Sequence, residues 1–84
     1  GTRVIQHESR SLEIFPNPAS GQIQVSLPEW VENPEFTIFD LSGRKIRKGR
    51  MDGGRLDVSG LQSGNYVLTI ESGSGTYAGK FVRK

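Results

Sequence analysis

Turn signals built from glycine and proline divide this chain at short, regular intervals, and this spacing limits the folds open to it. The intervals are about eight to twelve residues, and no window shows a sustained helical period. The segments between the turns are rich in β-branched, aromatic and aliphatic residues, which favour strands. We therefore predict an all-β fold, an immunoglobulin-like antiparallel β-sandwich of about seven strands, with an open barrel as the alternative. The predicted strands are 12–15, 22–27, 36–41, 44–48, 56–58, 65–70 and 76–84.

The stretch Leu56–Ile70 contains the longest apolar run and predicts the centre of the fold. Alternate residues place three apolar side chains on one face, namely Tyr66, Leu68 and Ile70. Val67 makes the opposite face partly apolar, as expected for a strand inside a sheet. Gly64 precedes this run, and we expect it to supply a positive φ where the chain turns into the strand.

A group of basic residues, by contrast, predicts a sheet edge. Ile46 is the one apolar residue of the segment 44–48, and charged edge strands resist pairing with other chains. Strict alternation would send these cations to both faces of the strand, so no continuous basic stripe is expected. With a net charge of only +2, the chain is not expected to bind nucleic acid. The basic residues concerned are Arg44, Lys45, Arg47, Lys48 and Arg50.

The length of 84 residues fits one domain. We read residues 1–11 as a polar linker and residues 12–84 as the domain, and the first residue, Gly1, suggests a piece of a longer protein. The chain has no cysteine, so neither disulfides nor a thiolate metal site can reinforce it. No apolar run reaches the roughly 18–20 residues that a membrane-spanning helix needs, so the chain is not expected to span a membrane.

Catalytic residues are hard to assemble from this sequence. The one histidine, His7, lies in the predicted linker, and a nucleophile and its base must be within about 3 Å of each other. Asp40, Asp52 and Asp57 all lie beside turns, where aspartate side chains commonly accept backbone hydrogen bonds. No phosphate-binding loop or metal-ligand spacing is present. We predict that the chain is not an enzyme and has no cofactor.

Carbohydrate binding is the alternative function that the residues suggest. Trp30 and Tyr77 could present aromatic faces to a sugar, in an accessory module of a larger secreted enzyme. Trp30 lies beside Val31, however, and could instead cover one end of the core. Loss of folding in Trp30→Ala would favour the core interpretation, and loss of sugar retention alone would favour a binding site.

Four segments in a fixed order carry a resemblance to a known family. They read FPNPASGQIQVS, FTIFDLSGRKI, LDVSGLQSGNYVLTI and KFVRK. Together they closely resemble the C-terminal sorting domain of the bacterial type IX secretion system, type A, over residues 12–84. Each piece is weak alone, because PNP and SG turns are common, but the four in register are highly specific.

The resemblance implies a small β-sandwich that carries no reaction of its own. Such a domain directs a cargo from the periplasm through the outer membrane to the cell surface or the medium. Its partners would be the outer-membrane translocon, the system's shuttle protein and a cysteine-peptidase sortase, which removes the domain and joins the cargo to anionic lipopolysaccharide. Cleavage would fall within residues 1–11 or just upstream. The family's motif residues would be Pro16, Asn17, Pro18, Asp40, Ser42, Gly43, Gly64, Tyr66, Lys80, Phe81, Val82 and Lys84.

The last of these motifs leaves two readings open. Lys80–Lys84 could contact the export machinery, and a free final strand could pair with the edge of a partner's sheet. Alternatively, Phe81 and Val82 could serve only to complete the hydrophobic core.

Overall fold

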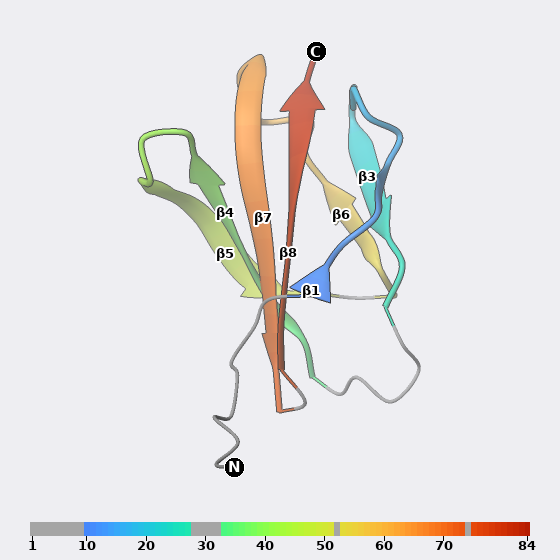
Figure 1. The fold of residues 1–84 in the computed structure, drawn as a ribbon. Helices are drawn as coiled ribbons and strands as arrows, with labels where there is room; N and C mark the ends of the chain where they lie inside the picture. The colour runs from blue at the N-terminus through green and yellow to red at the C-terminus, as the bar shows by residue number, and fades with distance from the viewer. Residues whose placement is uncertain (1–9, 28–32, 52, 74) are drawn as a thin grey trace, which may run out of the picture.

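The computed structural model describes residues 10–27, 33–51, 53–73 and 75–84, whose strands form a two-sheet sandwich (Figure 1). The larger sheet has the order β1 (Arg10–Ser11), β8 (Gly75–Arg83), β7 (Gly64–Ser72), β4 (Glu35–Asp40) and β5 (Lys45–Arg50). The smaller sheet has the order β2 (Ile14–Phe15), β3 (Gln22–Val25) and β6 (Arg55–Asp57). The predicted all-β sandwich of about seven strands is confirmed, with the two-residue β1 as an addition.

Strand β7 lies at the centre of the five-stranded sheet, as predicted. It pairs with β4 on one side and with β8 on the other. Tyr66, Leu68 and Ile70 are buried on its inner face, because period-two alternation points all three toward the smaller sheet. Gly64 begins the strand with a φ of +154°, a backbone conformation that residues other than glycine rarely adopt.

The hydrophobic core lies between the two sheets and draws on strands β3, β4, β6, β7 and β8 and on the loops beside them. The smaller sheet supplies Ile23, Val25 and Leu56, which alternate with polar residues along β3 and β6. The buried core residues are Ala19, Ile23, Val25, Phe36, Ile38, Met51, Leu56, Val58, Leu61, Tyr66, Leu68, Ile70, Tyr77 and Phe81.

Only the second half of the predicted first strand, 12–15, is a strand, and a separate short strand of the larger sheet lies just before it. Arg10–Ser11, assigned to the predicted linker, pair in parallel with Tyr77–Ala78 of β8, and the Leu12 amide donates to the Ala78 carbonyl at 2.9 Å. The chain then crosses to the smaller sheet, where Ile14 and Phe15 pair with β3. The prediction of one continuous strand was wrong because the residues between the two short strands connect the sheets. We call this side, residues 10–19 alongside β8, the closed flank.

Strands β5 and β6 are the edges of their sheets on the other side, which we call the open flank. The predicted edge position of the basic strand is therefore confirmed. Between the two edges, the Arg47 guanidinium (Nη1) donates to the Asp57 carbonyl at 3.0 Å. Gly60 lies against this side chain, since a Cβ added at Gly60 would be 3.1 Å from Arg47 Nη2.

Candidate functional site

The Pro16–Pro18 turn is fastened to the last strand by specific hydrogen bonds. Asn17 accepts a hydrogen bond through Oδ1 from the Val82 amide at 2.9 Å. The Ala19 amide donates to the Val82 carbonyl at 2.7 Å, and the Lys84 amide donates to the Ala19 carbonyl at 2.8 Å. The peptide bonds before both prolines are cis. A turn and a strand 65 residues apart in sequence therefore form one unit.

This arrangement corrects the hypothesis that the final strand is free to pair with a partner's sheet. On one side β8 pairs with β7 along its whole length, from Gly75 to Arg83. On its other side it is held by β1 near its start and by residues 17–19 near its end. The backbone groups of Val82 and Lys84 that would bind an added strand are already used by the closed flank.

Asp40, Ser42 and Gly43 form the tight turn between β4 and β5. Asp40 Oδ1 accepts from the Ser42 amide at 3.0 Å, the Ser42 hydroxyl at 2.7 Å and the Arg44 amide at 2.9 Å. Gly43 has a φ of +90°, which glycine adopts without steric cost. The Ser42 hydroxyl, followed by the Arg44 amide, lowers the pKa of Asp40, because these donors favour its charged form. The predicted role of Asp40 as a turn cap is confirmed.

Asp57 has the same role at the end of β6. Its Oδ1 accepts from the Ser59 amide at 2.9 Å, and hydrogen bonds from Ser59 lower its pKa. His7 and Asp52 lie outside the described residues. Within the described ranges, no group of three His, Cys, Asp or Glu residues could hold a metal ion.

Tyr66 and Phe81 connect the third and fourth motifs through the core. Their rings stack with centroids 5.5 Å apart and planes inclined by 25°. The Tyr66 hydroxyl donates to the Gln62 carbonyl at 2.7 Å. Phe81 is 1% exposed, whereas its neighbour Val82 is 38% exposed. The last motif therefore has two parts: Phe81 completes the core, and Val82 lies at the surface.

One surface hollow brings these motifs together. It has a volume of about 420 Å³ and is lined by Asn17, Leu41, Asn65, Tyr66, Lys80, Phe81 and Val82. The turn at 16–19, the hairpin tip at 41–44 and the last residues of β8 lie toward the same end of the sandwich (Figure 1). We call this region, residues 16–19, 41–44 and 80–84, the motif end. Pro16, Pro18, Ser42 and Lys84 are exposed within it.

The sequence analysis missed three residues that contribute to the motif end or to its hollow. Leu41 is 67% exposed, and Asn65 lines the hollow beside Val82. Arg83 donates to the Val58 carbonyl through Nε at 2.9 Å and to the Ser59 carbonyl through Nη2 at 3.0 Å. This guanidinium fastens the last strand to the loop after β6. The place of Leu41 and Asn65 inside the resembling segments was the one available signal.

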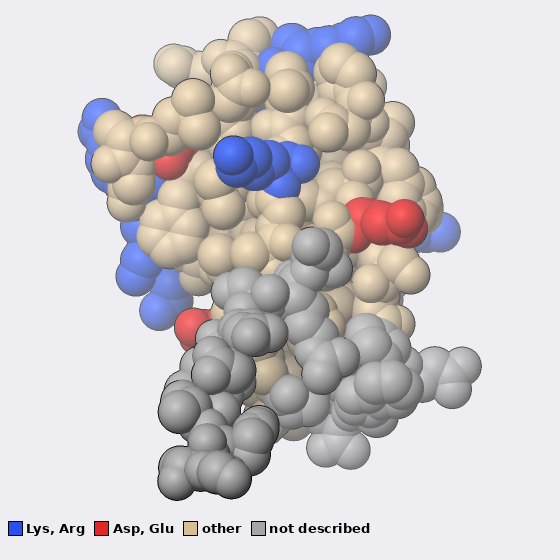
Figure 2. All heavy atoms as spheres, in the orientation of Figure 1, with Lys and Arg blue, Asp and Glu red and all other residues tan. Residues whose placement is uncertain are grey.

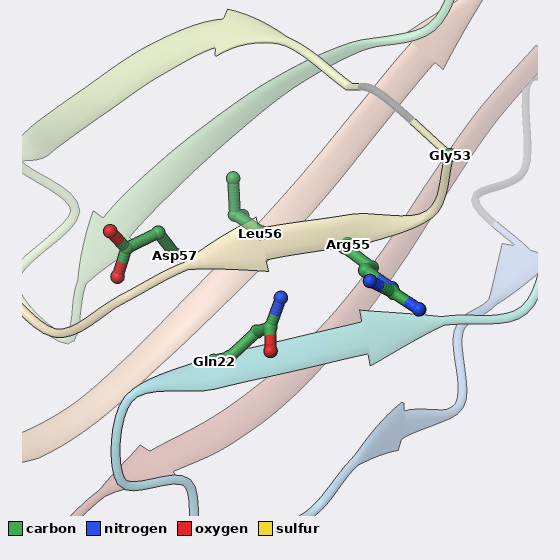
Figure 3. Close-up of a pocket in the computed structure, with 5 residues that line it drawn as sticks. All are labelled: Gln22, Gly53, Arg55, Leu56 and Asp57. Carbon is green, nitrogen blue, oxygen red and sulfur yellow. The ribbon is translucent and has the colours of Figure 1, made fainter.

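A second hollow, of about 510 Å³, lies on the smaller sheet (Figure 3). Gln22 of β3 and Arg55 and Asp57 of β6 line it, while Leu56 extends to the other side of its strand. None of the predicted motif residues lines this hollow. Asp57 already accepts from Ser59, so the geometry here is that of a shallow polar strand surface.

Two sequence-based expectations about binding are wrong. Tyr77 is 5% exposed and belongs to the core, so it cannot stack on a sugar. Trp30, the other aromatic residue of the carbohydrate alternative, lies outside the described residues.

The basic residues of β5 do not alternate strictly between the two faces of the strand, contrary to the prediction. The register shifts between Ile38 and Phe39, which leaves Ile46 as an extra, bulged residue.

The bulge changes which cations share a face. Lys45, Lys48 and Arg50 stand opposite Phe39, Thr37 and Glu35, respectively. Residues directly opposite each other in a ladder point to the same face, so these three cations gather on the outer face of the sheet. Figure 2 shows basic side chains along the side of the molecule that β4 and β5 occupy in Figure 1.

The fold and its motifs thus define a class: a small β-sandwich whose distinctive residues build turns and fasten one end. Comparison with family models then gives the family. The model described as "Secretion system C-terminal sorting domain" matches residues 13–84, so the chain belongs to this family, as the sequence predicted. No curated protein matches the chain.

Family membership makes the chain a type IX secretion sorting signal, and the family is not a catalytic one. Such a signal implies interaction with the type IX machinery and secretion across the outer membrane to the cell surface or extracellular space. Within the described ranges, no helix is long and apolar enough to cross a membrane.

Proposed function

We propose that the motif end is the surface through which the outer-membrane translocon and its shuttle protein recognise this domain. We also propose that a cysteine-peptidase sortase then cuts within residues 1–11 or just upstream, and joins the cargo to anionic lipopolysaccharide. In this proposal the domain carries the address and performs no reaction.

The observation that carries the proposal is the meeting of the four resembling segments at one hollow. Asn17, Leu41, Tyr66 and Val82 come from four separate segments of the chain, yet they line one surface. An apparatus that exports unrelated cargos must read a surface that those cargos share. Hydrogen bonds between residues 17–19 and the end of the chain at residues 82–84 hold this part of the surface in place, which reduces the ordering cost of binding.

The test is a transplant of the domain. Residues 1–84 are fused behind an inert fluorescent periplasmic protein, in a host with a type IX apparatus, and cell-surface and extracellular fluorescence are measured. We expect export of the reporter. A folded fusion that stays in the periplasm of a host proven to export other sorting domains would refute the proposal.

Substitution of an exposed residue can separate a loss of recognition from a loss of folding. Deletion of Phe81–Lys84 would remove a core side chain, so Val82→Ser is the better variant, because Val82 is partly exposed. Arg55→Ser, on the outer surface of the smaller sheet, is the matched control. We expect Val82→Ser to reduce export while both purified variants melt within a few degrees of the parent.

The sortase step has its own measurement. Mass spectrometry of the released domain should place its new N-terminus within or just before residues 1–11, and the exported cargo should carry lipopolysaccharide. An exported fusion that keeps the domain would contradict the sortase step alone and leave the address function standing.

A further inference from the structure

The outer face of the five-stranded sheet has an ordered pattern of side chains that the core does not use. Opposite residues of β5, β4, β7 and β8 form rows across the sheet, and one row reads Lys45, Phe39, Val67 and Lys80. Phe39 and Val67 are half-buried, and both lysines are exposed. Neighbouring strands lie about 4.8 Å apart, so the two lysine backbones are roughly 14 Å apart, with an apolar centre between them.

A second row, four residues farther from the motif end along β4, has a different charge. It reads Arg50, Glu35, Glu71 and Thr76. Glu35 and Glu71 stand directly opposite each other, and like charges in this position repel. Between the rows, Lys48 stands opposite Thr37 and Thr37 opposite Thr69. A hollow of about 420 Å³ on this face is lined by residues of both rows, including Phe39, Lys45, Glu35 and Glu71.

The β-bulge at Ile46 creates this pattern. Without it, Lys45 and Lys48 would point to opposite faces of β5, because they are an odd number of residues apart. The bulge also makes the edge of β5 a poor template for an added strand, as do its lysines. A partner would therefore contact side chains on the sheet face, not the backbone at the edge.

The charges on this face favour a protein over a membrane as its binding partner. A purely anionic surface, such as a phospholipid bilayer, would be attracted by the four cations of this face, Lys45, Lys48, Arg50 and Lys80, but it has no group of the right charge to pair with Glu35 and Glu71. A protein surface can match both signs and the apolar centre, and complementary charges fix the register of such a contact.

We propose that this outer face binds a protein of the export apparatus. The partner would present carboxylates to Lys45, Lys48 and Lys80, an apolar group to Phe39 and Val67, and a cation to Glu71. This inference rests on the proposed function and names the chemistry of the partner. It extends the contact from the motif end, whose hollow Lys80 also lines, across the sheet to β5.

The first experiment uses the reporter fusion with Lys45→Glu and Lys48→Glu combined. Neither is one of the predicted motif residues, although Lys45 lies in the second resembling segment. We expect at least a tenfold loss of exported fluorescence, because two attractive contacts become repulsive. Arg55→Glu is the matched control, an exposed cation on the other sheet, and should change export less than twofold. If the double variant melts well below the parent, Lys45→Gln and Lys48→Gln combined make the same test without adding negative charge, and a loss of export in that variant supports the inference.

The second experiment distinguishes a protein from a membrane. Glu71→Lys adds positive charge to the face, so a protein partner predicts several-fold weaker export, and an anionic bilayer predicts unchanged or stronger export. Co-sedimentation of the 84-residue chain with phosphatidylglycerol vesicles, with and without the double lysine change, measures lipid binding directly. Lysine-dependent vesicle binding, with export insensitive to Glu71→Lys, would overturn the inference in favour of a membrane.

A failure of this inference can be distinguished from a failure of the proposed function. If the parent fusion is exported and the double lysine variant is exported equally well, the inference is wrong and the proposed function stands. If the parent fusion itself is not exported, both are wrong.

Discussion

The two flanks of this sandwich are closed by different kinds of interaction. On the closed flank the main chain itself crosses between the sheets, and backbone amides of Leu12, Ala19 and Lys84 donate across the junction with β8. On the open flank the main chain also crosses, between Arg50 and Arg55, but farther along the two edges β5 and β6 are linked by a side chain, the guanidinium of Arg47. Main-chain connections hardly depend on side-chain identity, whereas a side-chain link is lost in one substitution. The closed flank should therefore resist perturbation, and the open flank should loosen first.

The largest expected effect comes from the core beneath the closed flank. Phe81→Ala removes a ring that is 1% exposed and stacks on Tyr66, so we expect a loss of about 3–5 kcal/mol of unfolding free energy. For a small domain this approaches the total stability. Urea unfolding followed by circular dichroism measures it, with the exposed neighbour Val82→Ala as control. Equal losses for the two variants would show that β8 is not anchored as described.

Next in size is a pair of glycine substitutions that compares the flanks. A Cβ at Gly79 would lie 3.0 Å from the Leu12 carbonyl oxygen and from Leu12 Cβ, so Gly79→Ala must displace backbone. We expect it to cost about 1–3 kcal/mol. Gly60→Ala meets the flexible end of Arg47 and should change stability by less than about 0.5 kcal/mol. Melting temperatures of both proteins decide the comparison, and a costlier Gly60→Ala would reverse it.

Smaller effects are expected from removing one hydrogen bond on each flank. Asn17→Ala and Arg47→Met should each cost about 1 kcal/mol. Hydrogen exchange locates the damage: Asn17→Ala should speed exchange at Val82 alone, and Arg47→Met should speed exchange along β5 and β6. Because the sites share no partner, the double variant should be nearly additive. Widespread exchange after Asn17→Ala would contradict the robustness of the closed flank.

The smallest expected effect is a loss of stability at acid pH. Hydrogen bonds lower the pKa values of Asp40 and Asp57 below the ordinary 3.8, and these residues flank β5 and β6. A lowered folded-state pKa means that the stabilisation is present above the unfolded value and is lost as pH falls through the folded value. We expect a modest drop in melting temperature below pH 4. The drop should shrink in Asp40→Asn, and an unchanged acid response in that variant would contradict Asp40's contribution.

Strand positions were largely predictable, because alternation directly reports which face of a strand is buried. Ile23 and Val25, and likewise Tyr66, Leu68 and Ile70, are buried as predicted. Tyr77 was misassigned although it shares a face with Phe81, four residues later in the same strand. The small residues Ala78 and Gly79 between them conceal that alternation.

The features that build the candidate site were harder to predict, because they depend on register and long-range contact. The bulge at Ile46 has no turn residue to mark it, yet it decides which lysines share a face. The hydrogen bond from the Val82 amide to Asn17 joins residues 65 positions apart. Arg83 donates to the carbonyls of Val58 and Ser59, which are 25 and 24 positions away. The family resemblance identified most of these segments, but not how they meet.

The parallel pairing of β1 with β8 fixes where the described chain enters the sandwich. Arg10 pairs with Tyr77, near the start of β8, and the chain continues another seven residues from Tyr77 to Lys84. At about 3.3 Å per residue, this point of entry is some 23 Å from Lys84. Any chain joined ahead of Arg10 therefore enters the sandwich at the end opposite the motif end, which leaves the surface that we propose for recognition uncovered by the entering strand.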